Sequence, residues 1–110
     1  MDLRRGDVVT VALHGDFSKP RPALILQRWV YPETENVTIA LITSDLLRAP
    51  HIRIGIEPDD RNGLRKPSEI TVDNVQTIRA QRIGAVIGSL DEATMHRVNT
   101  ALMIFLGLDV

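Results

Sequence analysis

Short runs of apolar and β-branched residues alternate with polar stretches along the chain. Such runs are typical of β-strands. The pattern predicts strands at 6–13, 22–30, 36–43, 52–57, 69–72 and 82–89, and a continuation of the fifth at 75–78 after a bend at Asp73-Asn74. In 52–57 the alternation is strict, which predicts one buried face and one solvent-exposed face.

Polar connections separate these strands, at 14–20, 31–35 and 58–67. Asn62-Gly63 signals a turn in the longest of them. Gly84 and Gly88 interrupt the last strand and predict bulges or close backbone approaches. Ser44 or Asp45 is expected to cap a single helical turn at 44–48, which Pro50 soon ends.

The period of the pattern changes after residue 89. Ser89-Leu90-Asp91-Glu92 fits a capping box with Ser89 at the cap. Spacings of three and four then predict an amphipathic helix that Gly107 stops; its apolar positions are Leu90, Ala93, Val98, Ala101, Leu102 and Phe105. Several strands followed by one long helix favour an α+β, mainly β fold, a compact antiparallel sheet or small barrel covered by a helix.

Composition narrows the class of protein. A chain of 110 residues with 44% hydrophobic residues predicts one domain, 1–110, with a real core. It has no cysteine, no long apolar span and no apolar signal region, so we expect a cytoplasmic protein without disulfides. The net charge of -1 does not argue for nucleic acid, although 11 of the 13 basic residues are arginine, which suits phosphate contact.

Arg21 is the strongest candidate for chemistry. It lies in Lys19-Pro20-Arg21-Pro22, at the entrance to an apolar strand that the two prolines stiffen. A guanidinium fixed there, next to a lysine, is a good phosphate clamp. The competing interpretation is an edge arginine that pairs with a carboxylate.

Other polar residues gather near predicted strand ends: Asp16 and Ser18 before Arg21, Thr43 and Ser44 at the end of the third strand, and Asp73 and Asn74 between two apolar stretches. Strand ends converge on one rim of a small barrel, where an arginine, a hydroxyl and a carboxylate can cleave a phosphodiester without metal. The alternatives are ordinary, with Thr43 and Ser44 at a strand end and helix cap and Asp73 in a turn. The three histidines lack zinc-motif spacing, and no cofactor motif is present, so we predict neither metal nor cofactor.

Five segments in order resemble the MazF/PemK toxins, the ribosome-independent endoribonucleases of toxin–antitoxin pairs. The resemblance spans nearly the whole chain. Its segments are Arg5-Gly6-Asp7-Val8-Val9, Arg21-Pro22-Ala23-Leu24-Ile25-Leu26, Ala40-Leu41-Ile42-Thr43-Ser44, Asp73-Asn74-Val75-Gln76-Thr77-Ile78, and Val98-Asn99-Thr100-Ala101-Leu102 with Leu106-Gly107-Leu108.

The resemblance implies an SH3-like barrel with a terminal helix, and a homodimer that binds single-stranded RNA along its groove. It implies cleavage at short sequence motifs without metal, by attack of a 2′-hydroxyl. Arg21 and Thr43 match the catalytic arginine and threonine, and Asp73 matches an acidic position that acts in some members. RNA contacts are expected from Asp16, Ser18, Lys19 and Ser44. Arg53, Arg61, Arg65, Lys66 and Arg79 are interpreted as solvated surface charges or, alternatively, as phosphate contacts.

The family also implies a partner, an antitoxin with a disordered acidic tail that folds over the same groove. One segment departs from the family, because 14–20 is shorter than the usual loop and lacks its glutamate and glycines. Two alternatives therefore stay open. The first is a non-enzymatic gyrase-binding toxin of the CcdB type, which needs a tryptophan near the carboxy terminus, whereas Trp29 is far from it. The second is a degenerate domain that retains only antitoxin binding.

Overall fold

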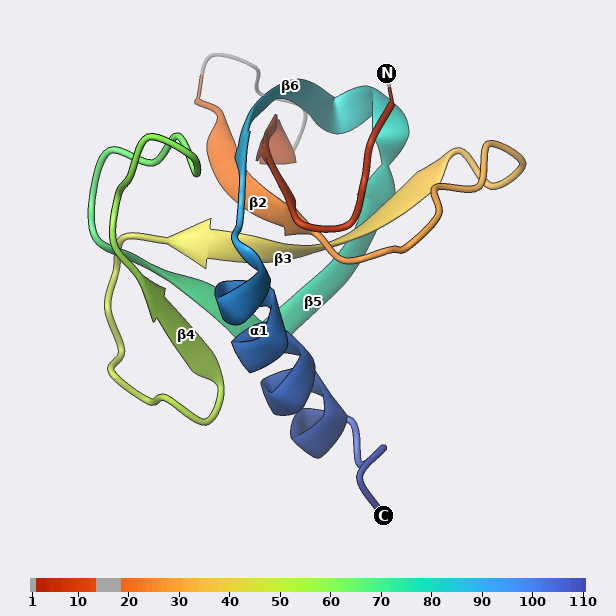
Figure 1. Ribbon diagram of the computed structural model, residues 1–110. Helices are drawn as coiled ribbons and strands as arrows, with labels where there is room; N and C mark the ends of the chain where they lie inside the picture. Colours follow the sequence, from red (N-terminus) through yellow and green to blue (C-terminus); the bar gives the residue numbers. More distant parts are fainter. Residues whose placement is uncertain (1, 14–18) are drawn as a thin grey trace.

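The computed structural model describes residues 2–13 and 19–110. These residues form six strands and a carboxy-terminal helix (Figure 1). The elements are β1 (Asp7–Val11), β2 (Arg21–Ile25), β3 (Asn36–Thr43), β4 (Arg53–Ile56), β5 (Ser68–Arg79), the 3-10 turn η2 (Ala80–Arg82), β6 (Ile83–Ser89) and α1 (Glu92–Phe105).

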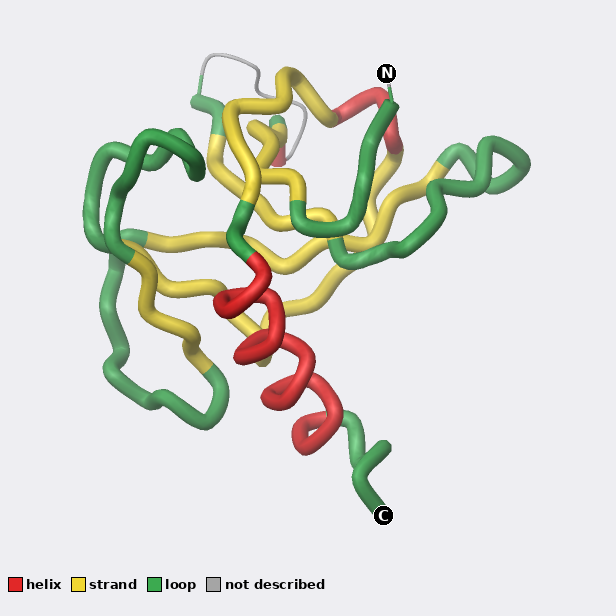
Figure 2. The backbone as a smooth tube through the Cα atoms, viewed as in Figure 1, coloured by secondary structure: helices red, strands yellow, loops and turns green. Residues whose placement is uncertain are grey.

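All strand pairs are antiparallel, in the order β4-β5-β3-β2-β1-β6. The sheet curls strongly, and the 58–67 connection bridges from its β4 side to β6 (Figure 2). There the Ser89 N–H donates to the Arg61 carbonyl at 2.9 Å. The predicted mainly β fold, a small barrel of antiparallel strands with a terminal helix, is confirmed.

The curled sheet is buried on both faces. One apolar cluster includes Leu24, Ile70 and Val72, and it packs against Val98 and Ala101 of α1. A second cluster, which includes Ala23, Ile25 and Ile39, lies on the opposite face. Neighbouring residues such as Ala23 and Leu24 point to opposite faces because side chains alternate along a strand. Arg21 and Thr43, at the ends of β2 and β3, project from this second face, as Ala23 and Leu41 do.

Several sequence predictions are wrong in detail. β2 ends at Ile25 and does not reach residue 30. The Thr38 N–H of β3 donates to the side-chain oxygen of Gln27 at 2.5 Å, and so it is not available to a backbone carbonyl of a longer β2. No helical turn forms at 44–48; instead, a carboxylate from β5 binds the N–H groups of Leu47 and Arg48.

The third correction concerns the start of α1. Its N-cap is Asp91, whose carboxylate accepts the Thr94 N–H at 2.7 Å, and not Ser89. Ser89 still belongs to β6, and its hydroxyl accepts from Arg61 Nε at 3.2 Å. The extended backbone of Ser89 therefore moves the cap two residues along.

The end of α1 follows the prediction. Gly107 adopts a φ of +73°, and its N–H and that of Leu108 bind the carbonyls of Ile104 and Met103. This pair of bonds is a Schellman motif, for which glycine is the preferred residue. Phe105, in contrast, is 47% exposed rather than packed on the sheet. No helix in the described part of the chain has the length and apolar character needed to cross a membrane.

Candidate active site

Strand pairing brings Arg21 and Thr43 together. Ala23 of β2 lies opposite Leu41 of β3 in the antiparallel register. Two residues further, Arg21 begins β2 and Thr43 ends β3, on the same face and at the same edge. The predicted convergence of these two strand ends is therefore present in the fold.

Arg21, Thr43 and Lys19 lie between two adjoining cavities and line both. We name the first, of about 500 Å³, the mixed cavity. Its lining is Leu13, Lys19, Arg21, Leu41, Ile42, Thr43, Asp45, Arg53, Thr71 and Asn74. We name the second, of about 640 Å³, the cationic cavity. Its lining is Thr10, Lys19, Pro20, Arg21, Pro22, Ile42, Thr43, Ser44, Gly63, Leu64, Arg65, Lys66, Ser68 and Ile87.

Charge distinguishes the two cavities. The cationic cavity presents four basic side chains, Lys19, Arg21, Arg65 and Lys66, and none of its described lining residues is acidic. Over residues 2–13 and 19–110, Arg21 forms no ion pair with a carboxylate, so the structural alternative for this arginine has no support there. A cavity of this charge favours a polyanion such as a nucleic-acid backbone.

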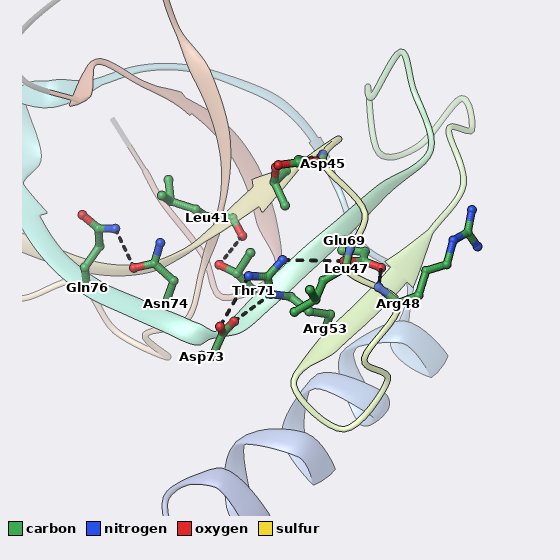
Figure 3. A network of polar contacts seen from close by, with 11 residues as sticks. Leu41, Asp45, Leu47, Arg48, Arg53, Glu69, Thr71, Asp73, Asn74 and Gln76 are labelled. Carbon is green, nitrogen blue, oxygen red and sulfur yellow. Dashed lines mark hydrogen bonds and ion pairs between the residues drawn. The ribbon is translucent and has the colours of Figure 1, made fainter.

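Asp73, the third predicted catalytic residue, lies outside both cavity linings. Its carboxylate binds Arg53, with Nε–Oδ1 at 2.8 Å and Nη2–Oδ2 at 3.4 Å (Figure 3). The hydrogen bond from Arg53 holds the pKa of the Asp73 carboxyl below its usual value. Asp73 is thus an ionised partner of Arg53, which lines the mixed cavity.

The other predicted contact residues are dispersed. Lys19 lines both cavities and Ser44 the cationic one, whereas Asp16 and Ser18 fall outside the described residues. Among the remaining basic residues, Arg65 and Lys66 line the cationic cavity, Arg61 binds Ser89, and Arg79 lies 3.6 Å from a Glu35 oxygen. In the described part of the chain, no three His, Asp or Glu side chains gather as metal ligands would.

Sequence reasoning missed one residue beside the site and misjudged the exposure of another. Glu69 is a carboxylate in the buried half of β5, only 5% exposed. Arg53 was interpreted as a solvated charge, but its side chain is 18% exposed and lies between Glu69 and Asp73. The sequence does carry a signal for Glu69. A single glutamate in an apolar, β-branched run lies in a strand, and a glutamate that is buried there needs partners for its charge.

The sequence comparisons point to one family. Residues 4–106 match the family described as PemK-like, MazF-like toxins of type II toxin–antitoxin systems. The chain is 38% identical over 107 residues to a probable endoribonuclease MazF from Mycolicibacterium smegmatis, covering 96% of this chain and 98% of that protein.

Solved structures agree as well. The Mycobacterium tuberculosis toxin MazF-mt6 superposes with a TM-score of 0.75 at 29% identity, over 92% of this chain and 96% of the toxin. A mycobacterial endoribonuclease in complex with its cognate antitoxin gives a TM-score of 0.78 at 27% identity, over 96% of each chain. The match over nearly the whole chain, together with the shared fold, establishes that this protein belongs to the PemK-like, MazF-like toxins of type II toxin–antitoxin systems.

Proposed function

We propose that the protein is a cytoplasmic toxin that cleaves single-stranded RNA at short sequence motifs without a metal ion. The observation that carries the proposal is the position of Arg21 and Thr43 between two cavities, one of them lined by four basic side chains. Relatives named endoribonucleases support the same activity. The RNA backbone occupies the cationic cavity, with the scissile phosphate at the Arg21–Thr43 edge and further contacts from Lys19 and Ser44.

The proposed reaction is an internal displacement at phosphorus. The ribose 2′-oxygen gives its proton to a general base and forms a bond to phosphorus, while the bond from phosphorus to the 5′-oxygen breaks and that oxygen takes a proton from a general acid. The products are a 2′,3′-cyclic phosphate and a 5′-hydroxyl. Arg21 stabilises the extra negative charge on the phosphorane-like transition state, and Thr43 donates a hydrogen bond to a phosphate oxygen. Asp73 contributes by holding Arg53 at the cavity wall.

A single-stranded RNA oligonucleotide assayed in EDTA tests this reaction. We expect cleavage to persist with the chelator, and the products to carry a cyclic phosphate and a free 5′-hydroxyl. The matched substrate carries one 2′-deoxynucleotide immediately before the cut and should resist cleavage there, because the attacking group is missing. Loss of activity in EDTA, or equal cleavage of the deoxy substrate, would contradict the mechanism. Intact RNA together with trapped gyrase–DNA complexes would favour the gyrase-binding alternative.

We also propose a homodimer and an antitoxin partner. The end of α1 and the residues after it leave apolar side chains uncovered, including Ile104 at 60%, Leu106 at 57% and Leu108 at 67% exposure. In Figure 1 this end of the helix extends away from the sheet. A second copy would remove these side chains from water. The cationic cavity, in turn, would attract the acidic tail of an antitoxin as well as RNA.

Light scattering tests the homodimer, and light scattering together with an RNA cleavage assay tests the antitoxin. The chain alone should have twice its own mass, and Ile104→Glu should yield monomers because a buried carboxylate lacks a partner at such an interface. Gln81→Glu, at an exposed position of η2 and outside α1, is the control and should remain dimeric. The candidate antitoxin is the product of any small acidic gene beside the one that encodes this chain, and adding that product should form a larger complex and suppress RNA cleavage. A monomeric parent chain, or cleavage unaffected by that product, would argue against the respective proposal.

A further inference from the structure

Glu69 is a buried acidic residue that strand pairing places directly opposite Thr43. The two residues are Cα partners in the β3–β5 ladder, and Glu69 is 5% exposed. Their side chains therefore project from the same face of the sheet. A carboxylate in such surroundings is stable only when several donors satisfy its oxygens.

The donors come mainly from the loop that follows Thr43. One oxygen of Glu69 accepts the Leu47 N–H at 2.9 Å, and the other accepts the Arg48 N–H at 3.0 Å (Figure 3). These bonds lower the pKa of the Glu69 carboxyl, so it is ionised at neutral pH. Arg48 adopts a φ of +61°, a conformation that a non-glycine residue holds only when its surroundings impose it. Glu69 thus fixes the path of residues 44–48.

Arg53 completes the anchor from the other side. Its Nη1 lies 3.7 Å from Glu69 Oε1, and its Nε lies 2.8 Å from Asp73 Oδ1. The arginine is held between two carboxylates on β5, and this network ties β4, β5 and the 44–48 loop together (Figure 3). Glu69 therefore fixes the 47–48 end of the loop, while Thr43 contacts its other end at Asp45.

The near end involves the hydroxyl of Thr43 itself. Thr43 Oγ1 accepts the Asp45 N–H at 3.0 Å. A hydroxyl that accepts from a backbone N–H keeps its own hydrogen for a second partner, in this case an oxygen of the bound phosphate. The direction of that donor depends on where Asp45 lies, and hence on a loop whose far end is bound to Glu69.

We propose that Glu69 is a positioning residue for RNA cleavage, acting through the 44–48 loop to orient the Thr43 hydroxyl toward the scissile phosphate. The proposal rests on the function proposed above. It predicts that the loss of Glu69 lowers kcat much more than it raises KM, because the phosphate-binding cations Lys19, Arg65 and Lys66 are left in place. It further predicts that the effect disappears when Thr43 no longer carries a hydroxyl.

A double-mutant cycle provides the test. Glu69→Gln keeps the side-chain shape but presents an NH2 group to one loop N–H, and should lower kcat by about 10- to 100-fold. In a Thr43→Ala background the same substitution should change kcat by less than about twofold, because the two changes act on one interaction. Glu57→Gln, at an exposed carboxylate just after β4, is the control and should leave kcat unchanged.

Thermal unfolding shows whether a Glu69 variant is folded, and this separates a loss of structure from a changed orientation of the Thr43 hydroxyl. If Glu69→Gln does not fold, Glu69→Asp is the second variant, because it keeps the charge but shortens the reach to the loop by one methylene. The proposal is overturned if the Glu69 variant cleaves at the parent's rate, or if it loses the same factor in both backgrounds, as a purely structural residue would. If Thr43→Ala itself cleaves at the parent's rate, the proposed function fails at its site.

Discussion

Replacement of Arg21 by alanine is expected to lower kcat for RNA cleavage by about 100- to 1000-fold, the typical cost of one donor to a developing oxyanion. Arg21 begins β2 and lines both cavities next to Thr43. Its guanidinium carries a permanent charge and two parallel N–H groups, which match two phosphate oxygens. The transition state gains charge at phosphorus relative to the bound substrate, so the loss should fall on kcat more than on KM.

Single-turnover cleavage of one RNA oligonucleotide measures this effect. Arg21→Lys restores charge without the bidentate geometry and should be intermediate between the parent and Arg21→Ala. The matched control is Arg28→Ala, since Arg28 is exposed, lies over the Trp29 ring and lines neither cavity. If Arg21→Ala and Thr43→Ala both cleave at the parent's rate, the site has been assigned to the wrong residues.

Strands in this chain were predictable where burial decides the structure. The bounds of β3 match the run of β-branched and apolar residues at 36–43, because both faces of that strand pack against apolar clusters. Likewise, the alternation at 52–57 matches buried Ile54 and Ile56 beside exposed Gly55. Periodicity is informative at such positions since each side chain has one favourable face.

Two of the failures depend on polar contacts with distant parts of the chain. Propensity favoured a helical turn at 44–48, but Glu69, 22 residues away from Leu47, supplies the acceptors that bind its N–H groups. Similarly, Asp91 displaces Ser89 as the helix cap because Ser89 remains in a strand. Local patterns cannot report a side chain that arrives from another strand.

The same distinction applies to the site. The sequence pattern placed Arg21 and Thr43 at strand ends and predicted that such ends converge, and the β2–β3 pairing brings these two together. The place of Asp73 depends on its hydrogen bond with Arg53. For Arg53, the alternation in 52–57 predicted only a position on the exposed face of a strand. Pairing between charged side chains on neighbouring strands depends on register and on a bulge in the β3–β5 ladder, neither of which can be read locally.

The closure of the barrel depends on Gly88, and Gly88→Ala is expected to destabilise the fold by about 1–3 kcal/mol. A Cβ at this position would lie 2.4 Å from the Arg61 carbonyl oxygen and 2.4 Å from the Asn62 carbonyl carbon. Both are backbone atoms, so they cannot move away as the end of a flexible side chain would. The 58–67 connection would have to separate from β6, breaking the hydrogen bond from the Ser89 N–H to Arg61.

That connection has little freedom to adjust. Asn62 is 4% exposed, and its side chain binds the Asp59 and Leu64 N–H groups and the Glu57 carbonyl. Because the loop is held rigidly, strain at Gly88 should also shift Arg65 and Lys66, which line the cationic cavity. We therefore expect Gly88→Ala to raise KM for RNA as well as to lower the free energy of unfolding.

Urea unfolding of two glycine variants measures the stability effect. Gly55→Ala is the matched control, because Gly55 also lies in a strand but a Cβ there would meet no heavy atom within 4 Å. It should change the free energy of unfolding by less than about 0.5 kcal/mol in the destabilising direction. Equal midpoints for the two variants would mean that the 58–67 connection yields without cost, and that closure of the barrel does not depend on the close approach at Gly88.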